Sequence, residues 1–326
     1  MTWADRITSI SSPQEFEAHC LDVFALQARN CTVYANYLAL LNVKVHDVAC
    51  VADIPFLPIE FFKTQQVISS GKPPQLVFSS SGTTGTIPSK HYVADVALYE
   101  RSFRAAFEKA YGPPSKLAVL ALLPSYSERE GSSLIYMVDD LIRQSKHPMS
   151  GYFLYNHSQL YDTLQHLKAT DVKTLLIGVT YALLDFAENY QLDFPDLLVM
   201  ETGGMKGRRR EMVREEVHER LCEGFNVQCI HSEYGMTELL SQAYSAGGGL
   251  FQCPPWMKVV IRDTNDPFSL LPMERTGAIS LIDLANVFSC SFIATHDLGR
   301  IRPDGRFEVL GRFDHSDIRG CNLLVG

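Results

Sequence analysis

Short apolar runs that alternate with amphipathic helical patterns constrain the fold of this chain more than any other feature. Apolar runs of strand length are typical of buried strands, and the helical patterns between them are typical of helices that pack on a sheet. The alternation predicts an α/β fold with a largely parallel sheet. In chain order, strands are expected at 117–123, 152–155, 174–179 and 197–201, and helices at 96–111, 134–143, 159–167 and 182–190.

Loops that follow strands of such a sheet are the usual ligand sites, and two loops have that predicted position. One is Glu201-Thr202-Gly203-Gly204, and the other follows the apolar run 76–78. The second of these loops consists of small residues: Ser79, Ser80, Ser81, Gly82, Thr83, Thr84, Gly85 and Thr86. Glycines let the backbone approach a ligand, successive N–H groups surround phosphate oxygens, and hydroxyls add donors. Lys90 would supply a cation.

The loop at 79–86 does not fit the ordinary P-loop pattern G-x-x-x-x-G-K-[ST]. From the residues alone, two interpretations stay open. One is a phosphate-binding loop, and the other is a Ser/Thr-rich surface loop.

A second motif, His231-Ser232-Glu233-Tyr234-Gly235-Met236-Thr237-Glu238, follows a strand expected at 227–230. The Tyr234 ring can pack on adenine, and Thr237 can donate a hydrogen bond to a phosphate oxygen. Glu238 can help to hold Mg²⁺ on a triphosphate. The alternative is a strand end that Gly235 interrupts.

From Met257 onward the chain reads as short strands, at 258–262, 278–283 and 291–295. Asp304-Gly305 is a hairpin signal between two further runs. We expect a small barrel or an antiparallel subdomain at about 257–310. This region also contains Thr295-His296-Asp297 and, just beyond it, Gly311-Arg312-Phe313-Asp314, although Asp297 alone is more commonly a turn residue.

These four motifs, in this order, resemble those of the adenylate-forming enzymes: acyl-CoA synthetases, luciferases and peptide-synthetase adenylation domains. The resemblance covers about 76–320 and implies the large N-terminal domain of an acyl-CoA synthetase, with stacked, mostly parallel sheets, helices and a small β-barrel. It implies ATP and Mg²⁺ as cofactors, with Lys90, Thr237 and Glu238 in catalysis and Glu238 on the metal. Asp297 would bind the ribose, and Arg312 the ribose or the α-phosphate. Nucleotide contacts are also implied for Ser79, Ser80, Ser81, Gly82, Thr83, Thr84, Gly85, Gly203, Gly204, Tyr234 and Gly235.

Within this superfamily, residues 231–245 and 318–325 are similar to the acyl-protein synthetase (LuxE-type) branch. That likeness implies that a fatty acid is activated and passed through Cys321 to an acyl reductase or another acceptor protein. Seven residue steps separate Cys321 from Asp314, so an extended tether would span at most about 25 Å. The alternative for Cys321 is a small apolar residue that anchors the C-terminus. The expected domains are 1–310 for adenylation and 311–326 for a hinge remnant and Cys-bearing tail.

Three departures from the family pattern stand out. Residues 86–89 make the first loop longer than usual, so the position of Lys90 differs. His296 replaces the usual Gly before Asp297. The chain ends soon after the hinge motif, so we expect no C-terminal lid domain with its catalytic Lys.

The remaining N-terminal segments are expected to be structural. A helix is predicted to begin at Ser12-Pro13-Gln14-Glu15, and a second to cover 34–41. The prolines in Ile54–Lys63 exclude a regular helix, which leaves a buried aromatic connector or a wall for an acyl chain. A helix expected at 206–222 mixes basic and acidic residues, which is typical of a solvated face.

Composition limits the function classes. The net charge of −8 provides no basic footprint for nucleic acid. The N-terminus lacks the pattern of a secretory signal, and no apolar run approaches a membrane-spanning length. The eight cysteines lack a CxxC pattern, which fits a reducing cytoplasm.

Three functions stay open. The first is a carboxylic acid ligase that loads its own cysteine, and the second is a ligase that uses coenzyme A or a carrier protein. The third is a degenerate nucleotide-binding or scaffold protein. For either ligase, the expected partner is a small carboxylic acid.

Overall fold

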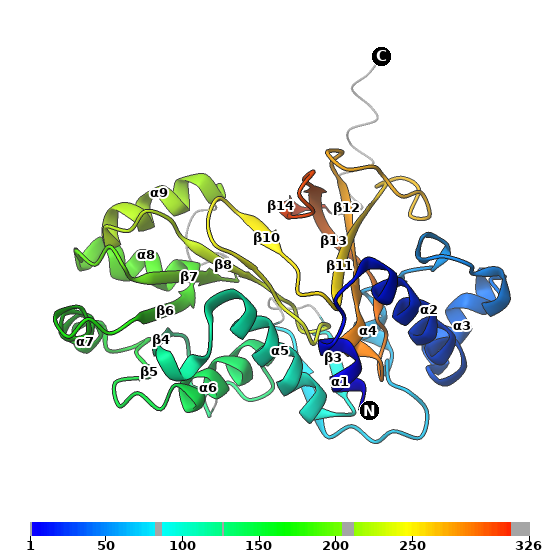
Figure 1. Ribbon diagram of the computed structural model, residues 1–326, viewed down its shortest axis with the longest axis horizontal. Coiled ribbons are helices and arrows are strands. Elements are labelled where there is room, and N and C mark those ends of the chain that lie inside the picture. The colour runs from blue at the N-terminus through cyan, green and yellow to red at the C-terminus, as the bar shows by residue number, and fades with distance from the viewer. Residues whose placement is uncertain (1, 82–86, 126, 204–211, 314–326) are drawn as a thin grey trace, which may run out of the picture. The chain divides into compact units, whose positions relative to one another are not determined.

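The computed structural model describes residues 2–81, 87–125, 127–203 and 212–313 (Figure 1). The chain divides into two compact units, which we describe separately. The first is built from Met1–Ser102, Thr237–Ser241 and Gln252–Gly326, and the second from Phe103–Met236 and Gln242–Phe251. The short segment Thr237–Ser241 belongs to the first unit although both of its neighbours in sequence belong to the second.

The second unit contains the parallel sheet that the alternating pattern predicts. Strands β8, β7, β6, β4 and β5 lie in that spatial order and are parallel, and β9 pairs antiparallel with β8, with β10 next to it. The strands are β4 (Ala118–Leu122), β5 (Gly151–Tyr152), β6 (Thr174–Val179), β7 (Leu198–Thr202), β8 (His231–Tyr234), β9 (Ala243–Ser245) and β10 (Leu250–Gln252). The helices are α6 (Ser133–Ser145), α7 (His157–Ala169), α8 (Thr180–Asn189) and α9 (Arg214–Phe225), with the 3-10 turn η3 (Pro114–Lys116).

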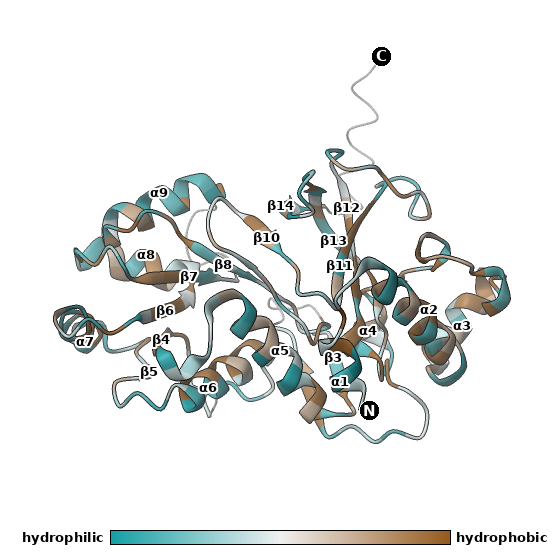
Figure 2. Ribbon diagram, in the orientation of Figure 1, coloured by the Kyte–Doolittle hydropathy of each residue, from teal (hydrophilic) through white to brown (hydrophobic). Residues whose placement is uncertain are grey.

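The core of the second unit lies around β4 and β6, in which every residue is buried. Such runs can only be central strands that are covered on both faces. Figure 1 shows α8 and α9 on one side of these strands and α6 on the other. Figure 2 colours β6 brown and much of α9 teal, as expected for a buried strand and a helix with one solvated face.

The first unit contains the antiparallel strands that were expected after Met257. Strands β11, β12, β13 and β14 pair in that order, and β1 adds in parallel to β13. A separate hairpin joins β2 to β3. The strands are β1 (Leu57–Pro58), β2 (Leu76–Ser79), β3 (Lys90–Val93), β11 (Met257–Arg262), β12 (Gly277–Asp283), β13 (Phe292–Ile301) and β14 (Phe307–Arg312).

Short helices at the N-terminus pack in the same unit, and α5 (Val96–Tyr111) has the bounds that the sequence predicts. The Ser12 side chain caps α2 by accepting a hydrogen bond from the Glu15 N–H, as expected. The Tyr34 hydroxyl of α3 donates to the carbonyl oxygen of Pro55, which ties the proline-containing connector to the core. The helices are α1 (Trp3–Thr8), α2 (Pro13–Asn30), α3 (Thr32–Leu40) and α4 (Phe61–Thr64), with 3-10 turns η1 (Val45–Asp47), η2 (Val51–Asp53) and η4 (Leu284–Asn286).

Two local predictions are wrong. The loop after β2 does not follow a strand of the parallel sheet, because β2 pairs antiparallel with β3 and exposes Val77, which a central parallel strand would bury. Residues 227–230 are not a strand. Asn226, with φ 51°, caps the C-terminal end of α9, and the Val227 N–H donates to the Cys222 carbonyl oxygen of that helix. β8 begins only at His231.

The predicted helix at 206–222 begins later than expected. Residues 204–211 lie outside the described chain, and Val213 is extended, so α9 begins at Arg214. No described helix is long and apolar enough to cross a membrane. The predicted α/β fold class is confirmed, whereas the predicted division at 310 stays a prediction.

The hairpin between β13 and β14 provides a test of the turn chemistry. Gly305 has φ 83°, and a Cβ there would meet no atom within 4 Å, so any cost of a side chain is conformational. We expect Gly305→Ala to lower the free energy of unfolding by about 1–2 kcal/mol. Gly305→Asn should cost less, because Asn tolerates this backbone region better. Urea unfolding measures both, and equal losses for the two variants would contradict this explanation.

Candidate active site

The base of the first predicted loop is closed by a pair of serines. Ser79 pairs with Lys90 across the β2–β3 hairpin. One residue further along, Ser80 donates its N–H to the Ser89 carbonyl oxygen at 3.0 Å, and Ser89 donates its N–H to the Ser80 hydroxyl at 2.9 Å. Ser81 is exposed just beyond this pair. Four predicted phosphate-binding residues of this loop lie outside the described chain: Gly82, Thr83, Thr84 and Gly85.

His91 joins this hairpin to the second motif. Its side chain is fully buried, and Nδ1 lies 2.9 Å from the carbonyl oxygen of Thr237. A carbonyl only accepts, so Nδ1 carries the proton and the neutral ring has its lone pair on Nε2. Burial lowers the pKa of His91 to about 4, although the hydrogen bond to Thr237 acts in the opposite direction. The ring also packs edge-on against Phe62 at 5.7 Å.

Glu238 is buried between this hairpin and η4. Burial raises the pKa of its carboxyl group, and the opposing influences are a hydrogen bond from the Ser89 side chain and the positive charges of Arg312 and Lys63. Asn286 donates its side-chain N–H to the Glu238 carbonyl oxygen at 2.8 Å. The Glu238 carboxyl group, the Ser89 hydroxyl and the Asn286 amide therefore come together in the first unit.

The segment that follows Glu238 is held by Asp283 at the end of β12. This fully buried carboxylate accepts hydrogen bonds from Leu240 N–H at 2.8 Å, Ser241 N–H at 3.0 Å, Ser241 hydroxyl at 2.6 Å and Ala285 N–H at 3.1 Å. Burial raises the pKa of Asp283, and these four bonds counteract it. The indole N–H of Trp256 also donates to the Ser241 hydroxyl at 3.0 Å.

Asp297 and Arg312 form an ion pair across β13 and β14. They are direct partners in the strand register, and Nε of Arg312 lies 2.9 Å from Oδ1 of Asp297. The aspartate side chain is 7% exposed and the arginine side chain 77%, so the guanidinium covers a carboxylate that is otherwise buried. The third and fourth motifs are thus one structural feature.

The motif residues of the second unit lie at the carboxyl ends of β7 and β8. Gly203 follows β7 with φ 76°, and Tyr234 ends β8, with its ring 5.8 Å from Phe251. Gly235 comes next in the chain and is exposed. This is the edge of a parallel sheet at which ligands usually bind. Gly204 lies outside the described residues.

Two glutamates flank this edge, and their environments differ. Burial raises the pKa of Glu233 to about 7 against the hydrogen bond from Thr202, and the charge of Glu201 adds to the increase. Burial also opposes ionisation of Glu201, but the neighbouring polar side chains outweigh it, first of all His218, whose Nε2 lies 3.7 Å from Oε1 of Glu201, so the pKa of Glu201 is lowered. Glu201 in β7 is the direct strand partner of Ser232 in β8, so these two side chains share one face of the sheet. Glu233 is the next residue of β8, and its side chain therefore points to the opposite face.

The structure places two further residues at this site, His91 and Ser89. Both lie in the stretch that carries the first motif, but no role was predicted for either of them. The only available signal was position, because His91 and Ser89 flank Lys90. Cys321 lies outside the described residues, and the seven described cysteines are free thiols.

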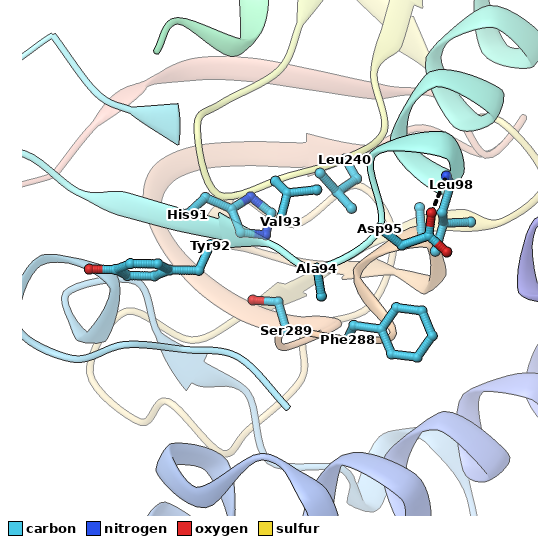
Figure 3. A pocket seen from close by; sticks show the side chains of 10 residues that line it. His91, Tyr92, Val93, Ala94, Asp95, Leu98, Leu240, Phe288 and Ser289 are labelled. Atoms are coloured by element: carbon cyan, nitrogen blue, oxygen red, sulfur yellow. Dashed lines mark hydrogen bonds between the residues drawn. The ribbon is translucent and has the colours of Figure 1, made fainter. Parts of the chain in front are cut away.

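A small pocket lies next to His91 (Figure 3). Its free volume is about 10 Å³, far below that of typical ligand pockets, and its lining includes Leu240, Phe288 and Ser289. Asp95 lies at one end, where it accepts a hydrogen bond from the Leu98 N–H at 3.0 Å. The pocket is too small for a nucleotide, and we interpret it as a packing defect behind the β2–β3 hairpin.

The residues present fit a magnesium ion that is held mainly by its substrate. In the described part of the chain, no three His, Cys, Asp or Glu side chains gather to hold a metal ion. Mg²⁺ commonly uses one or two protein carboxylates together with the phosphates of a nucleotide. The buried Glu238 carboxylate next to the first loop meets that requirement.

Solved structures of adenylate-forming ligases share this fold. A 2-hydroxyisobutyryl-CoA ligase in its postadenylation state aligns with 95% of this chain and 70% of its own, with a TM-score of 0.70 and 12% identity. ATP-bound MatB from Rhodopseudomonas palustris aligns over 72% and 47%, with a TM-score of 0.55 and 17% identity. A luciferase-like enzyme from the mealworm Zophobas morio aligns over 75% and 59%, with a TM-score of 0.51 and 14% identity. The fold predicted from the motifs is therefore confirmed.

Sequence comparison leads to a more particular likeness. The chain is 27% identical over 142 residues to the long-chain-fatty-acid–luciferin-component ligase of Vibrio harveyi. This match covers 40% of the chain and 37% of that ligase. No protein-family model matches the chain. The resemblance to adenylate-forming enzymes is confirmed by the two comparisons together.

The buried His91 predicts a pH dependence of stability. Its pKa of about 4 in the folded protein lies below the ordinary value of 6.5, so between these values the unfolded chain binds a proton that the folded chain does not. Stability is therefore lost as the pH falls through this window, by up to about 3 kcal/mol. His91→Asn keeps a donor for the Thr237 carbonyl but does not titrate.

Urea unfolding of wild type and His91→Asn between pH 7.5 and pH 4 measures this effect. The difference in unfolding free energy between the two should be constant above pH 7 and shrink below pH 6.5. A constant difference over the whole range would contradict the neutral, buried state of His91.

Proposed function

We propose that this protein activates a carboxylic acid with ATP to form an acyl-adenylate. The observation that carries the proposal is the ion pair of Asp297 with Arg312 in the unit that also holds the buried Glu238 and the Ser80–Ser89 pair. A Ser/Thr/Gly loop begins at this point. Phosphate chemistry requires such a combination of hydroxyls, a metal-binding carboxylate and cations.

Each residue has a distinct role in this proposal. Asp297 accepts hydrogen bonds from the ribose hydroxyls, and the charged acceptor makes these bonds stronger than neutral ones. Arg312, held over Asp297, neutralises the α-phosphate, and Thr237 donates to a phosphate oxygen. Loop N–H groups and Lys90 surround the remaining phosphates.

The chemical step is an in-line displacement at phosphorus. The substrate carboxylate oxygen forms a bond to the α-phosphorus, the bond from that phosphorus to the bridging oxygen breaks, and pyrophosphate leaves. A magnesium ion, when bound at Glu238, supplies further neutralisation of the triphosphate. The residues of this chain position the reactants and lower the charge repulsion between them.

The second step transfers the acyl group to a thiol. A thiolate attacks the acyl carbonyl carbon, a C–S bond forms, and the C–O bond to AMP breaks, so AMP leaves. Similarity to a long-chain-fatty-acid–luciferin-component ligase supports a fatty acid as the substrate. The motif resemblance of residues 318–325 is what favours Cys321 as the thiol and an acyl reductase as the final acceptor. Likeness to 2-hydroxyisobutyryl-CoA ligase supports coenzyme A as the alternative acceptor.

Glu238→Gln tests the first step. The substitution removes the carboxylate charge at nearly constant volume, so we expect acid-dependent exchange of pyrophosphate into ATP to fall about 10- to 100-fold. Glu17→Gln on α2, an exposed position, is the matched control and should exchange like wild type. A panel of carboxylic acids from acetate to long-chain fatty acids supplies the substrate. Full exchange by the Glu238 variant would remove this residue from the site, and no exchange by wild type would refute the proposed activity.

Cys321→Ser tests the second step. We expect this variant to form acyl-adenylate as fast as wild type, because activation needs no thiol, but to lose the hydroxylamine-labile acyl group from the protein. Intact-protein mass spectrometry after incubation with ATP and the acid measures the adduct. An adduct of undiminished yield on the variant would exclude Cys321 as the acceptor. Acyl-coenzyme A formed equally by both proteins, without any protein adduct, would support the external thiol.

A further inference from the structure

The third motif lies in a bulge of the antiparallel sheet of the first unit. On β13, the three residues of this motif lie opposite a single residue of β12, Ile279, because the register between the two strands shifts here. A bulge interrupts the ladder of hydrogen bonds and changes the direction of the side chains that it carries. It leaves the Thr295 carbonyl oxygen without a register partner on β12. The direction of Asp297 therefore depends on what holds the bulge.

Side-chain hydrogen bonds replace the missing ladder bonds. The buried Arg262 of β11 donates from Nη2 to the Thr295 carbonyl oxygen at 2.7 Å. The Thr295 hydroxyl donates to the Ile279 carbonyl oxygen at 2.8 Å, and it accepts from the Asp297 N–H at 3.1 Å. Arg262 thus fixes the residue that in turn holds the backbone of Asp297.

The same guanidinium group also contacts the fourth motif. Its Cζ atom lies 5.7 Å from the centre of the Phe313 ring, a distance at which a cation and an aromatic ring attract each other. Phe313 donates its N–H to the His296 carbonyl oxygen at 3.0 Å, and the two rings lie 5.6 Å apart. Since Phe313 directly follows Arg312, the guanidinium of Arg262 contacts the chain near both partners of the Asp297–Arg312 ion pair.

A buried cation at this position is explained by its reach rather than by stability. Arg262 is 7% exposed, and within the described part of the chain its Nε has no hydrogen-bond partner. An apolar side chain of similar volume is often at least as stabilising as a buried charge. However, β12 lies between β11 and β13, so a side chain must span two strand spacings, about 9.6 Å, to reach Thr295. A long side chain that ends in several donors meets that requirement.

We propose that Arg262 is a positioning residue for the nucleotide, which holds the bulge so that Asp297 faces the ribose and keeps its pairing with Arg312. This inference rests on the proposed function, because that function assigns the ribose to Asp297. Arg262 is buried and acts through Asp297 without touching the ligand. ATP and AMP contain the same ribose, so binding of both depends on Arg262 to the same degree.

Titration calorimetry with ATP and with AMP, in the presence of Mg²⁺, tests this role. Arg262→Met keeps most of the length of the side chain and removes the donor to Thr295, so both dissociation constants should rise about tenfold, by the same factor. Arg262→Lys keeps a charged donor and should restore part of the affinity. Arg275→Met, which removes an exposed arginine of the same unit, is the control and should bind both nucleotides like wild type.

A double-mutant cycle separates positioning from a general loss of structure. In an Asp297→Ala background, Arg262→Met should change the dissociation constant for ATP by less than about twofold, because the residue through which it acts is gone. Hydrogen exchange adds a direct measurement of the bulge. Exchange in β13 should be faster in Arg262→Met than in wild type, whereas exchange in β4 of the second unit should not change.

Other outcomes would overturn the assignment. Wild-type affinity in Arg262→Met would exclude the role, and so would a loss for ATP alone or an undiminished loss in the Asp297→Ala background. If Arg262→Met does not fold, Arg262→Lys takes its place in the cycle, and a loss that persists without Asp297 would again exclude the role. A wild-type protein that binds ATP but shows no acid-dependent pyrophosphate exchange would refute the proposed activity alone. A wild-type protein that binds neither nucleotide would refute both proposals.

Discussion

The hydrogen bonds to Asp283 are the interaction on which the site depends. They hold Leu240 and Ser241 against the end of β12, and one residue, Leu239, separates these from Thr237 and Glu238 in the chain. A buried carboxylate without partners would be strongly destabilising, and the three backbone N–H groups that it satisfies would otherwise be buried without an acceptor. Because donor and acceptor each need the other, the segment Thr237–Ser241 has one position within the first unit.

Two departures from the family pattern acquire partners in this structure. The lengthened loop contributes Ser89, which closes the loop onto Ser80 and donates to Glu238. His296, in place of glycine, pairs with Glu60. Both are contacts between segments that lie far apart in sequence or outside any motif. Through these contacts, the residues that depart from the family pattern still pack beside the charged residues of the motifs.

The site concentrates charge at positions of low exposure. Asp297 and Glu238 are both about 5% exposed, and Asp297 is paired with Arg312, whose side chain reaches solvent. In such surroundings a charge is screened less than in water, so its interaction with an opposite charge is stronger. The same burial keeps His91 neutral, which preserves the bond that joins the first loop to the second motif.

The sequence by itself determined the fold class, most helices and strands, and the identity of the motifs, because apolar periodicity, caps and turn residues act over a few neighbouring positions. The bounds of α5 and β6 and the turn at Gly305 were predictable for that reason. Only the tertiary structure decided that β2 pairs with β3 and that β8 begins at His231, since pairing partners depend on which faces are covered. It also decided that Ser89 and His91 join the site. Their roles come from hydrogen bonds between distant segments, which no local pattern encodes.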